Sequence, residues 1–340
     1  MKKKLVCLII ILCIIILSLC FHPVSLNRIE RIWELWQWNS GKMQVILYDR
    51  RSEEILQQIA NTSYAEILRL DSIINEHRKD SIAGLVGHAL ENGEKIQGTE
   101  EIVYLLQFAI KMYEDSKGLF DITIAPLLNL WKDSAKNNQL PTEEQIISCQ
   151  KKLGVSKIHI QENYEIAADD ILSINLGGFS KGYAIDKVAE VLKSQNIENG
   201  MVNLGGDLYC FGKKIWTIGI QNPINANAES PDSILATIQV QNKAVATSGH
   251  YRRFVEIQGK HYSHIINPIT GLPVDNEILS VTVIADTAMI ADAYATVFTM
   301  TSPEVTMEYA KKYNLQVLLI TKEQQFIMTP DFPTIYYSKP

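Results

Sequence analysis

Along the first half of the chain, apolar residues recur every three or four positions, which is the spacing of one face of a helix. The longest run of this kind begins after Ser52, a residue type that caps helices, and is predicted to end near Glu76. Its apolar stripe consists of Ile55, Ile59, Ile67, Leu70 and Ile74. Two more helices are predicted, from Thr99 to Lys117 and from Thr142 to Leu153, and each is followed directly by a glycine.

Along the second half, apolar and polar residues alternate, which is typical of half-buried strands. This alternation predicts strands at residues 216–220, 235–240, 279–285, 316–321 and 325–328, and it also marks Met43 to Tyr48. Residues 251–266 have the pattern of a hairpin that turns at Gly259-Lys260. Helices are predicted at residues 181–193, 289–299 and 302–313. Because helices and strands mix without regular βαβ order, the predicted class is α+β, with helices packed on a mixed, largely antiparallel sheet.

The N-terminus departs from both patterns. Lys2 to Lys4 precede an uncharged apolar run from Leu5 to Phe21, an order that places the N-terminus in the cytoplasm. Residues 1–21 are therefore predicted to be a membrane anchor or signal segment, and an uncleaved anchor is favoured. Cys20 follows Leu17-Ser18-Leu19, which resembles a lipoprotein processing box, so a lipoprotein is the alternative. Either form places the folded part at the extracytoplasmic face of the cell membrane.

Residues 22–39 are predicted to be a juxtamembrane linker, followed by one domain at residues 40–335. The linker contains Trp33, Trp36 and Trp38, which suit either a bilayer interface or the first core contacts of the domain. Both interpretations remain open on the sequence.

Composition and charge limit the classes of function. The 340 residues are 46% hydrophobic and 21% charged, which supplies a sizeable core, and the net charge of −6 argues against nucleic-acid binding. Of the 5 cysteines, Cys149 and Cys210 lie outside the apolar N-terminal run. One disulfide or two buried thiols both fit this pair.

The most informative candidate site is the segment Asn175 to Asp186, in which Gly177 and Gly178 lie between an extended run and a helix. Glycines there let backbone groups approach a ligand without a Cβ, and a helix N-terminus with Lys181 offers positive charge to a phosphate. A tight turn before an ordinary amphipathic helix explains the same residues. The segment is neither a P-loop nor a dinucleotide-binding fingerprint.

Other polar, glycine-containing clusters lie at residues 118–127, 203–207, 246–253 and 264–271, and each also fits a plain turn or a solvated edge. Asp292 and Thr296 lie one turn apart on a predicted helix, so their oxygens share a face that suits Mg²⁺. The alternative is a solvated Asp292 and a Thr296 hydroxyl bonded to the carbonyl of residue 292.

These clusters follow one another in the order G-x-F-D-x-x-x-x-P-L, L-G-G-x-x-K-G-Y-A-x-D, N-x-G-G-D, T-S-G-x-Y, H-I-I-x-P-x-T-G and A-D-A-x-A-T. In this order the chain resembles the FAD:protein FMN transferases, the ApbE family, over about residues 40–330. The resemblance implies an ApbE/T-fold-like domain that transfers FMN from FAD to a Thr or Ser hydroxyl of an acceptor protein and releases AMP. It also implies Mg²⁺ as cofactor, FAD as substrate, and a membrane-tethered or lipoprotein form.

The resemblance further implies three sets of site residues. FAD would be bound by Leu119, Phe120, Asp121, Asn175, Lys181, Thr247, Ser248, Gly249 and Ile266. Mg²⁺ would be held by the side chains of Asp292 and Thr296 and by the carbonyl groups of Gly178 and Ala295. The catalytic residues would be Lys181 and His264, with His264 accepting the proton of the incoming hydroxyl.

The chain departs from the family pattern at Asn175 and Asn267, where aspartate is usual. The early motif around residues 39–43 is also poorly kept. Two other functions also fit the residues. One is a Mg²⁺-dependent FAD pyrophosphatase that gives FMN and AMP, and the other is a membrane-tethered flavin-binding protein without turnover.

Overall fold

A computed structural model of the chain describes residues 26–35, 41–224, 233–249 and 254–337. Its centre is an eight-stranded sheet in which all neighbouring strands are antiparallel. The strands, in spatial order, are β1 (Asn27–Leu35), β2 (Gly41–Asp49), β6 (Asn199–Leu204), β7 (Asp207–Gly212), β10 (Lys243–Gly249), β13 (Ile278–Ala285), β14 (Gln316–Thr321) and β15 (Phe326–Met328). The predicted α+β class with a largely antiparallel sheet is confirmed.

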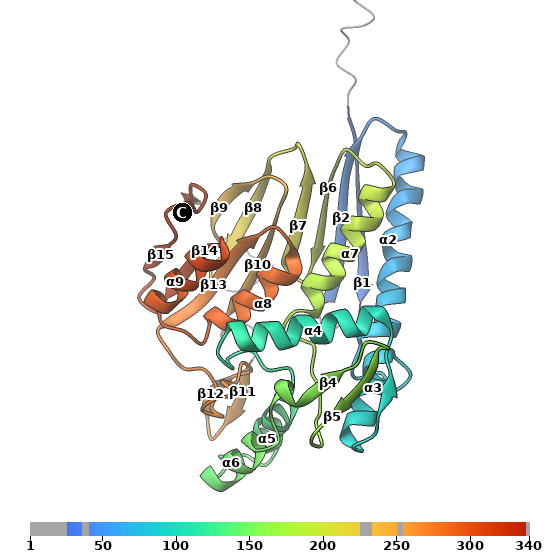
Figure 1. The fold of residues 1–340 in the computed structure, drawn as a ribbon. Helices are drawn as coiled ribbons and strands as arrows, with labels where there is room; N and C mark the ends of the chain where they lie inside the picture. The colour runs from blue at the N-terminus through green and yellow to red at the C-terminus, as the bar shows by residue number, and fades with distance from the viewer. Residues whose placement is uncertain (1–25, 36–40, 225–232, 250–253, 338–340) are drawn as a thin grey trace, which may run out of the picture.

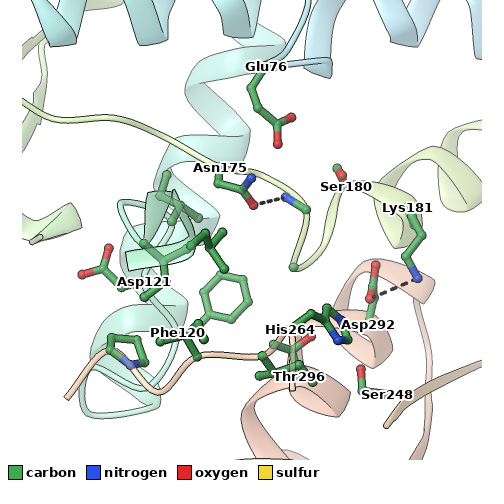
Figure 2. A pocket seen from close by; sticks show the side chains of 18 of the residues that line it. Glu76, Phe120, Asp121, Asn175, Ser180, Lys181, Ser248, His264, Asp292 and Thr296 are labelled. Atoms are coloured by element: carbon green, nitrogen blue, oxygen red, sulfur yellow. Dashed lines mark hydrogen bonds and ion pairs between the residues drawn. The ribbon is translucent and has the colours of Figure 1, made fainter. Parts of the chain in front are cut away.

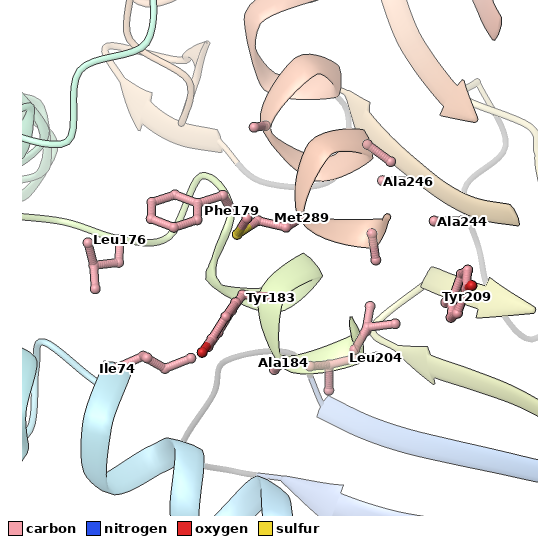
Figure 3. Packing of buried hydrophobic residues seen from close by; sticks show 14 of the residues in the cluster. Ile74, Leu176, Phe179, Tyr183, Ala184, Leu204, Tyr209, Ala244, Ala246 and Met289 are labelled. Atoms are coloured by element: carbon pink, nitrogen blue, oxygen red, sulfur yellow. The ribbon is translucent and has the colours of Figure 1, made fainter. Parts of the chain in front are cut away.

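Helices cover one face of this sheet (Figure 1). They are α2 (Glu53–Ile74), α7 (Ser180–Ser194), α8 (Ala288–Phe298) and α9 (Pro303–Tyr313). Helix α7 packs between α2 and α8, and α8 rests on β10 and β13. Figure 3 shows the core around the start of α7, where Phe179 lies next to Met289 of α8 and Tyr183 is directed towards Ile74 at the end of α2.

A smaller sheet covers the opposite face. It contains β8 (Trp216–Gln221), β9 (Ile234–Val240) and β16 (Tyr336–Tyr337) in the order β16-β9-β8. The predicted alternation is present in β8, where Trp216, Ile218 and Ile220 are buried while Thr217 and Gly219 are exposed. The main sheet is therefore buried on both faces.

A second region lies below the helix layer in Figure 1. It contains α3 (Ile82–Glu91), α4 (Glu100–Asp115), α5 (Ala125–Lys136) and α6 (Glu143–Gln150). The short strands β3 (Ile96–Gln97), β4 (Ile158–Ile160) and β5 (Glu165–Ala168) form a sheet of their own beside the 3-10 turn η2 (Val155–Lys157). The hairpin of β11 (Phe254–Ile257) and β12 (Lys260–Ser263) packs near α5. This region supplies the other walls of the candidate site.

Most predicted helix starts are confirmed by their caps. Ser52, Thr99 and Ser302 each accept a backbone N–H of the first turn, and Thr142 forms the predicted capping box with Gln145. The hairpin turns at Gln258 and Gly259, both with positive φ, one residue earlier than predicted.

Two helices were not predicted, and both contain residues that usually interrupt helices. Helix α3 contains Gly84 and Gly87, and Gly84 is required because the Arg78 carbonyl occupies the position of a Cβ. Helix α5 begins with Pro126 in its first turn, where a missing N–H costs nothing. Both residue types therefore stand at positions where these helices tolerate them.

The N-terminal predictions are tested only in part. Residues 27–35, expected to lie in a linker, form β1, the edge strand of the main sheet, whose mixed charged and apolar residues give little alternation. Trp33 stacks on Tyr64, with ring centroids 5.9 Å apart, as a core contact. Residues 1–21, Trp36 and Trp38 lie outside the described residues. Within the described ranges, no helix combines the length and apolar character needed to cross a bilayer.

The two cysteines of the folded part are not joined. Cys149 is partly buried and Cys210 is fully buried, and both are free thiols. Of the two sequence-based alternatives, the structure has the pair of thiols.

Candidate functional site

One cavity of about 550 Å³ opens where the glycine turn before α7, one side of α8, the end of β10 and the loop after β12 meet (Figure 2). It brings together nearly all the predicted site residues from motifs spread along the chain. They are Leu119, Phe120, Asp121, Asn175, Gly178, Lys181, Thr247, Ser248, Gly249, His264, Ile266, Asp292 and Thr296. Ala295 does not line the cavity, and its side chain is fully buried in the core.

The glycine turn is held from behind by Asn175. Its Oδ1 accepts the N–H of Gly177 at 3.1 Å, and its own backbone N–H donates to the Ile122 carbonyl at 2.6 Å. The amide side chain supplies an acceptor for the turn, as a carboxylate at this position would. Asn175 therefore supports the cavity wall as well as lining it.

Gly178 is required by the close approach of an aromatic ring. A Cβ on Gly178 would lie 2.9 Å from Cε2 of Phe120, whose ring packs against Phe179. Phe120 and Phe179 are both buried. The absence of a side chain at Gly178 lets the turn pass close over this apolar wall, and a Cβ there would push the Phe120 ring aside.

The Asp121 carboxylate mainly stabilises the turn in which it lies. Its Oδ1 accepts both the backbone N–H and the hydroxyl of Thr123, at 2.8 and 2.6 Å, just before α5 begins. Burial raises the pKa of its carboxyl, although these hydrogen bonds act in the opposite direction. In Figure 2 its carboxylate points away from the centre of the cavity.

Asp292 is a buried carboxylate, not a solvated one. It is 4% exposed, and its Oδ2 accepts the backbone N–H of Gly182 at 3.0 Å. Burial raises the pKa of its carboxyl well above the ordinary range, while the nearby Lys181 acts to lower it. Thr296 lies one turn further along α8 and lines the same cavity. The two residues thus line one cavity from the same helix, and the shared oxygen face stays a prediction.

Lys181 stands between two carboxylates. Its Nζ donates to Oδ2 of Asp207 and lies 3.8 Å from Oδ1 of Asp292. The Asp207 side chain is 3% exposed, whereas that of Lys181 is 30% exposed and reaches the cavity. Asp207 belongs to a cluster that the sequence singled out as a turn or site, but no spacing rule assigned it a role.

Helices α7 and α8 are joined by more than apolar packing. Asp186 accepts the backbone N–H groups of Ala288 and Met289 at 2.8 and 2.9 Å, so a residue of α7 caps α8. Thr287 caps the same end through Ile290. The two motifs that contain Lys181 and Asp292 thus form one interlocked unit.

The loop after β12 carries His264 to the rim of the cavity. Asn267 shapes this loop, because its Oδ1 accepts the N–H groups of Ile269 and Thr270 at 2.9 and 3.2 Å. Trp131 of α5 donates to the Gly271 carbonyl at 3.0 Å and fixes the loop from below. His264 itself is exposed. The amide at Asn267 keeps the turn that an aspartate would form.

Glu76 and His77 also line the cavity, although no motif pointed to them. The chain turns out of α2 at Asn75, and Figure 2 shows the Glu76 side chain directed towards Asn175. The Glu76 side chain is 12% exposed, and burial raises the pKa of its carboxyl. An acidic residue at a helix end normally suggests solvent, so the sequence carried no signal for this placement.

Known proteins similar to this chain match most of its length. The profile of the ApbE family matches residues 41–319. An FAD:protein FMN transferase of Vibrio cholerae is 32% identical over 274 residues, which is 77% of this chain and 80% of the relative. An FAD:protein FMN transferase of Haemophilus influenzae is 30% identical over 266 residues, which is 75% of this chain and 76% of the relative.

Two solved structures share the fold. The flavin transferase ApbE of Vibrio cholerae superposes with a TM-score of 0.72 at 28% identity, over 92% of this chain and 97% of that one. The ApbE protein of Thermotoga maritima superposes with a TM-score of 0.77 at 24% identity, over 90% of this chain and 97% of that one.

Proposed function

This chain belongs to the ApbE family, and we infer from that membership that it is an FAD:protein FMN transferase. It transfers FMN from FAD to an acceptor protein, with a threonine or serine hydroxyl as the receiving group and AMP as the leaving group. The observation that carries this inference is the convergence of motifs from across the chain on one cavity. Its volume of about 550 Å³ is typical of sites for small molecules and cofactors.

The residues at one end of the cavity fit Mg²⁺. Asp292 and Thr296 carry side-chain oxygen atoms, which this cation prefers, and the buried Asp292 carboxylate can take a further positive partner because Lys181 makes its closer contact with Asp207. The carbonyl of Gly178 is proposed as a further ligand, and that of Ala295 stays a prediction. When bound, the cation would neutralise charge on the diphosphate of FAD.

The chain's own residues bind and orient the substrate. The Lys181 ammonium reaches the cavity beside the N-terminus of α7, where it attracts the diphosphate. Phe120 and Ile266 offer apolar surface for a flat ring system, and both are buried. Binding thus places the charged part of FAD towards Lys181 and Asp292.

His264 is proposed as the base that takes the proton of the incoming hydroxyl. Its position at the exposed rim of the cavity suits this role, because the acceptor group arrives on another protein from solvent. Replacement by glutamine should lower kcat by about 10²–10⁴-fold with little change in FAD binding. Single-turnover kinetics with a saturating acceptor would measure this, and unchanged turnover would remove His264 from the mechanism.

Asp292→Asn tests the cation site. The amide keeps an acceptor for Gly182 but removes the charge, so Mg²⁺-dependent transfer should fall at least ~100-fold while the fold is retained. Adding EDTA to the wild type should have the same effect. Asp133→Asn, at an exposed carboxylate on α5, is the matched control and should transfer normally. Normal transfer by Asp292→Asn would exclude this residue as a metal ligand.

The products distinguish transfer from the two other functions. FAD, Mg²⁺ and a domain that carries the acceptor hydroxyl should yield a flavin-fluorescent protein band with the added mass of FMN. Free FMN and AMP without a labelled acceptor would instead indicate a pyrophosphatase. Intact bound FAD would indicate a binding protein without turnover.

The proposed location is the extracytoplasmic face of the cell membrane. It is supported by the lysines at positions 2–4 and by the apolar run at residues 5–21, as an uncleaved anchor or, with Cys20 modified, a lipoprotein.

A further inference from the structure

Asp207 occupies a place that only a tight hairpin provides. Strands β6 and β7 are joined through Gly205 and Gly206, with φ of 64° and 102°, and Asn203 accepts the N–H of Gly206 at 2.9 Å. Leu204 and Asp207 are direct partners in the ladder. The turn therefore places Asp207 at the end of the sheet where the cavity lies.

Both carboxylate oxygens of Asp207 are engaged by residues that line the cavity. Oδ2 accepts from Lys181 Nζ, and Oδ1 accepts the backbone N–H of Thr247 at 3.0 Å. Thr247 is held in turn by Thr282, with the two hydroxyl oxygens 2.9 Å apart. Asp207 itself does not line the cavity, so its influence on the site passes through Lys181 and β10.

Lys181 has two carboxylates within reach, and Asp207 has the closer contact. Asp292 Oδ1 is only 3.8 Å from the Lys181 Nζ. When the closer carboxylate loses its charge, a lysine ammonium on a flexible stem will move nearer to the other buried carboxylate in reach, because a buried charge without a close counter-charge is costly. Without the charge of Asp207, Lys181 would therefore move from 3.8 Å into direct contact with Asp292 and compete with a cation for it.

We propose that Asp207 is a positioning residue that holds Lys181 off Asp292, which keeps Asp292 available to a divalent cation and leaves the Lys181 charge directed at the substrate. The proposal rests on the proposed function, because it assigns Asp292 to the cation. Because the proposal concerns the charges of Asp207, Lys181 and Asp292, a measurement of cation binding tests it without any transfer reaction.

The test uses Asp207→Asn, which retains an acceptor for the Thr247 N–H, removes the charge and replaces the oxygen that accepts from Lys181 by an amide NH2 group. Mn²⁺ alone, followed by loss of its free-ion electron paramagnetic resonance signal, reports cation binding in the full chain. Asp207→Asn should weaken Mn²⁺ binding by about tenfold or more, since a competing buried charge pair is worth at least this much. Its transfer activity should recover in part at high Mg²⁺, a change in KM more than in kcat.

The double variant Asp207→Asn/Lys181→Met removes both charges of the pair and is expected to fold, because neither position is left with a charge that has lost its partner. With the competitor gone, it should bind Mn²⁺ at least as tightly as the wild type. Weak Mn²⁺ binding by the double variant, or wild-type binding by Asp207→Asn, would overturn the proposal. Absence of transfer in the wild type would instead refute the proposed function. The Mn²⁺ measurements would still decide whether Asp207 holds Lys181 away from Asp292.

Discussion

At the scale of single residues, the tightest constraint near the cavity lies at Gly182. A Cβ at this position would overlap the Ala288 carbonyl and lie 2.7 Å from the Cα of Met289. The absent side chain also lets the Gly182 N–H reach Asp292. The glycine therefore sets the distance between α7 and α8 on which the proposed cation site depends.

Gly182→Ala should separate the two helices, because backbone atoms cannot yield as a flexible side chain can. We expect a loss of about 2–4 kcal/mol in the free energy of unfolding, as in overpacked cores, together with a large loss of transfer. Urea unfolding and transfer assays would measure the two effects. The matched control is Gly87→Ala in α3, where the new Cβ would lie 3.5 Å from Ile174 and helix propensity should make the change neutral or stabilising. Equal stability of the two variants would contradict the close-approach argument.

At the scale of secondary-structure elements, the cavity depends on the pairing of α7 with α8. Asp186 caps α8 from α7, and Gly182 donates to Asp292, so each helix orients the polar groups of the other. Burial raises the pKa of Asp186 to about 6, against an ordinary value of 3.8, although the two N–H donors act to lower it. The carboxyl that joins α7 to α8 therefore changes its protonation state near pH 6.

This shift has a defined sign. A carboxyl whose pKa is higher in the folded state contributes stability below pH 4, and the contribution is lost as the pH rises to about 6. Its upper limit is about 3 kcal/mol. In EDTA, the free energy of unfolding of the wild type should fall across this range relative to that of Asp186→Asn, which cannot titrate. Parallel pH profiles of the two proteins in urea unfolding would show that Asp186 does not titrate there.

At the scale of the whole molecule, the cavity is assembled from segments that lie far apart in the sequence. The main sheet and its helices supply Lys181, Thr247 and Asp292, whereas the second region supplies Phe120 and His264. The sheet begins at β1, so the folded domain starts before the expected boundary at residue 40.

Two truncations separate membrane attachment from folding. A variant that lacks residues 1–25 should lose membrane association in cell fractionation and keep its melting temperature and transfer activity. A variant that lacks residues 1–36 also loses β1, with the buried Ile29 and the Trp33–Tyr64 stack, and should melt roughly 5 °C lower or more. Membrane-bound behaviour of the first variant, or equal melting of the two, would contradict these assignments.

The parts of the fold that were predictable depend on local chemistry. Helix caps and strand alternation depend on residues that are close in the sequence, so they can be predicted from it. The caps at Ser52 and Thr142 and the alternation in β8 were confirmed. Helix α3 and strand β1 were missed because their local signals are weak and distant contacts stabilise them. The site residues were named through a resemblance, and their meeting in one cavity is what the structure adds.

By itself, the sequence determined the types of most elements, the order of the motifs and the family they resemble, because these follow from neighbouring residues. Only the tertiary structure decided that Asp292 is buried, that Lys181 is shared with Asp207 and that Asp186 caps α8. The physical reason is separation along the chain. Gly182 and Asp292 are 110 residues apart, and Asp186 and Ala288 are 102 apart, so their burial and charge depend on how distant segments pack.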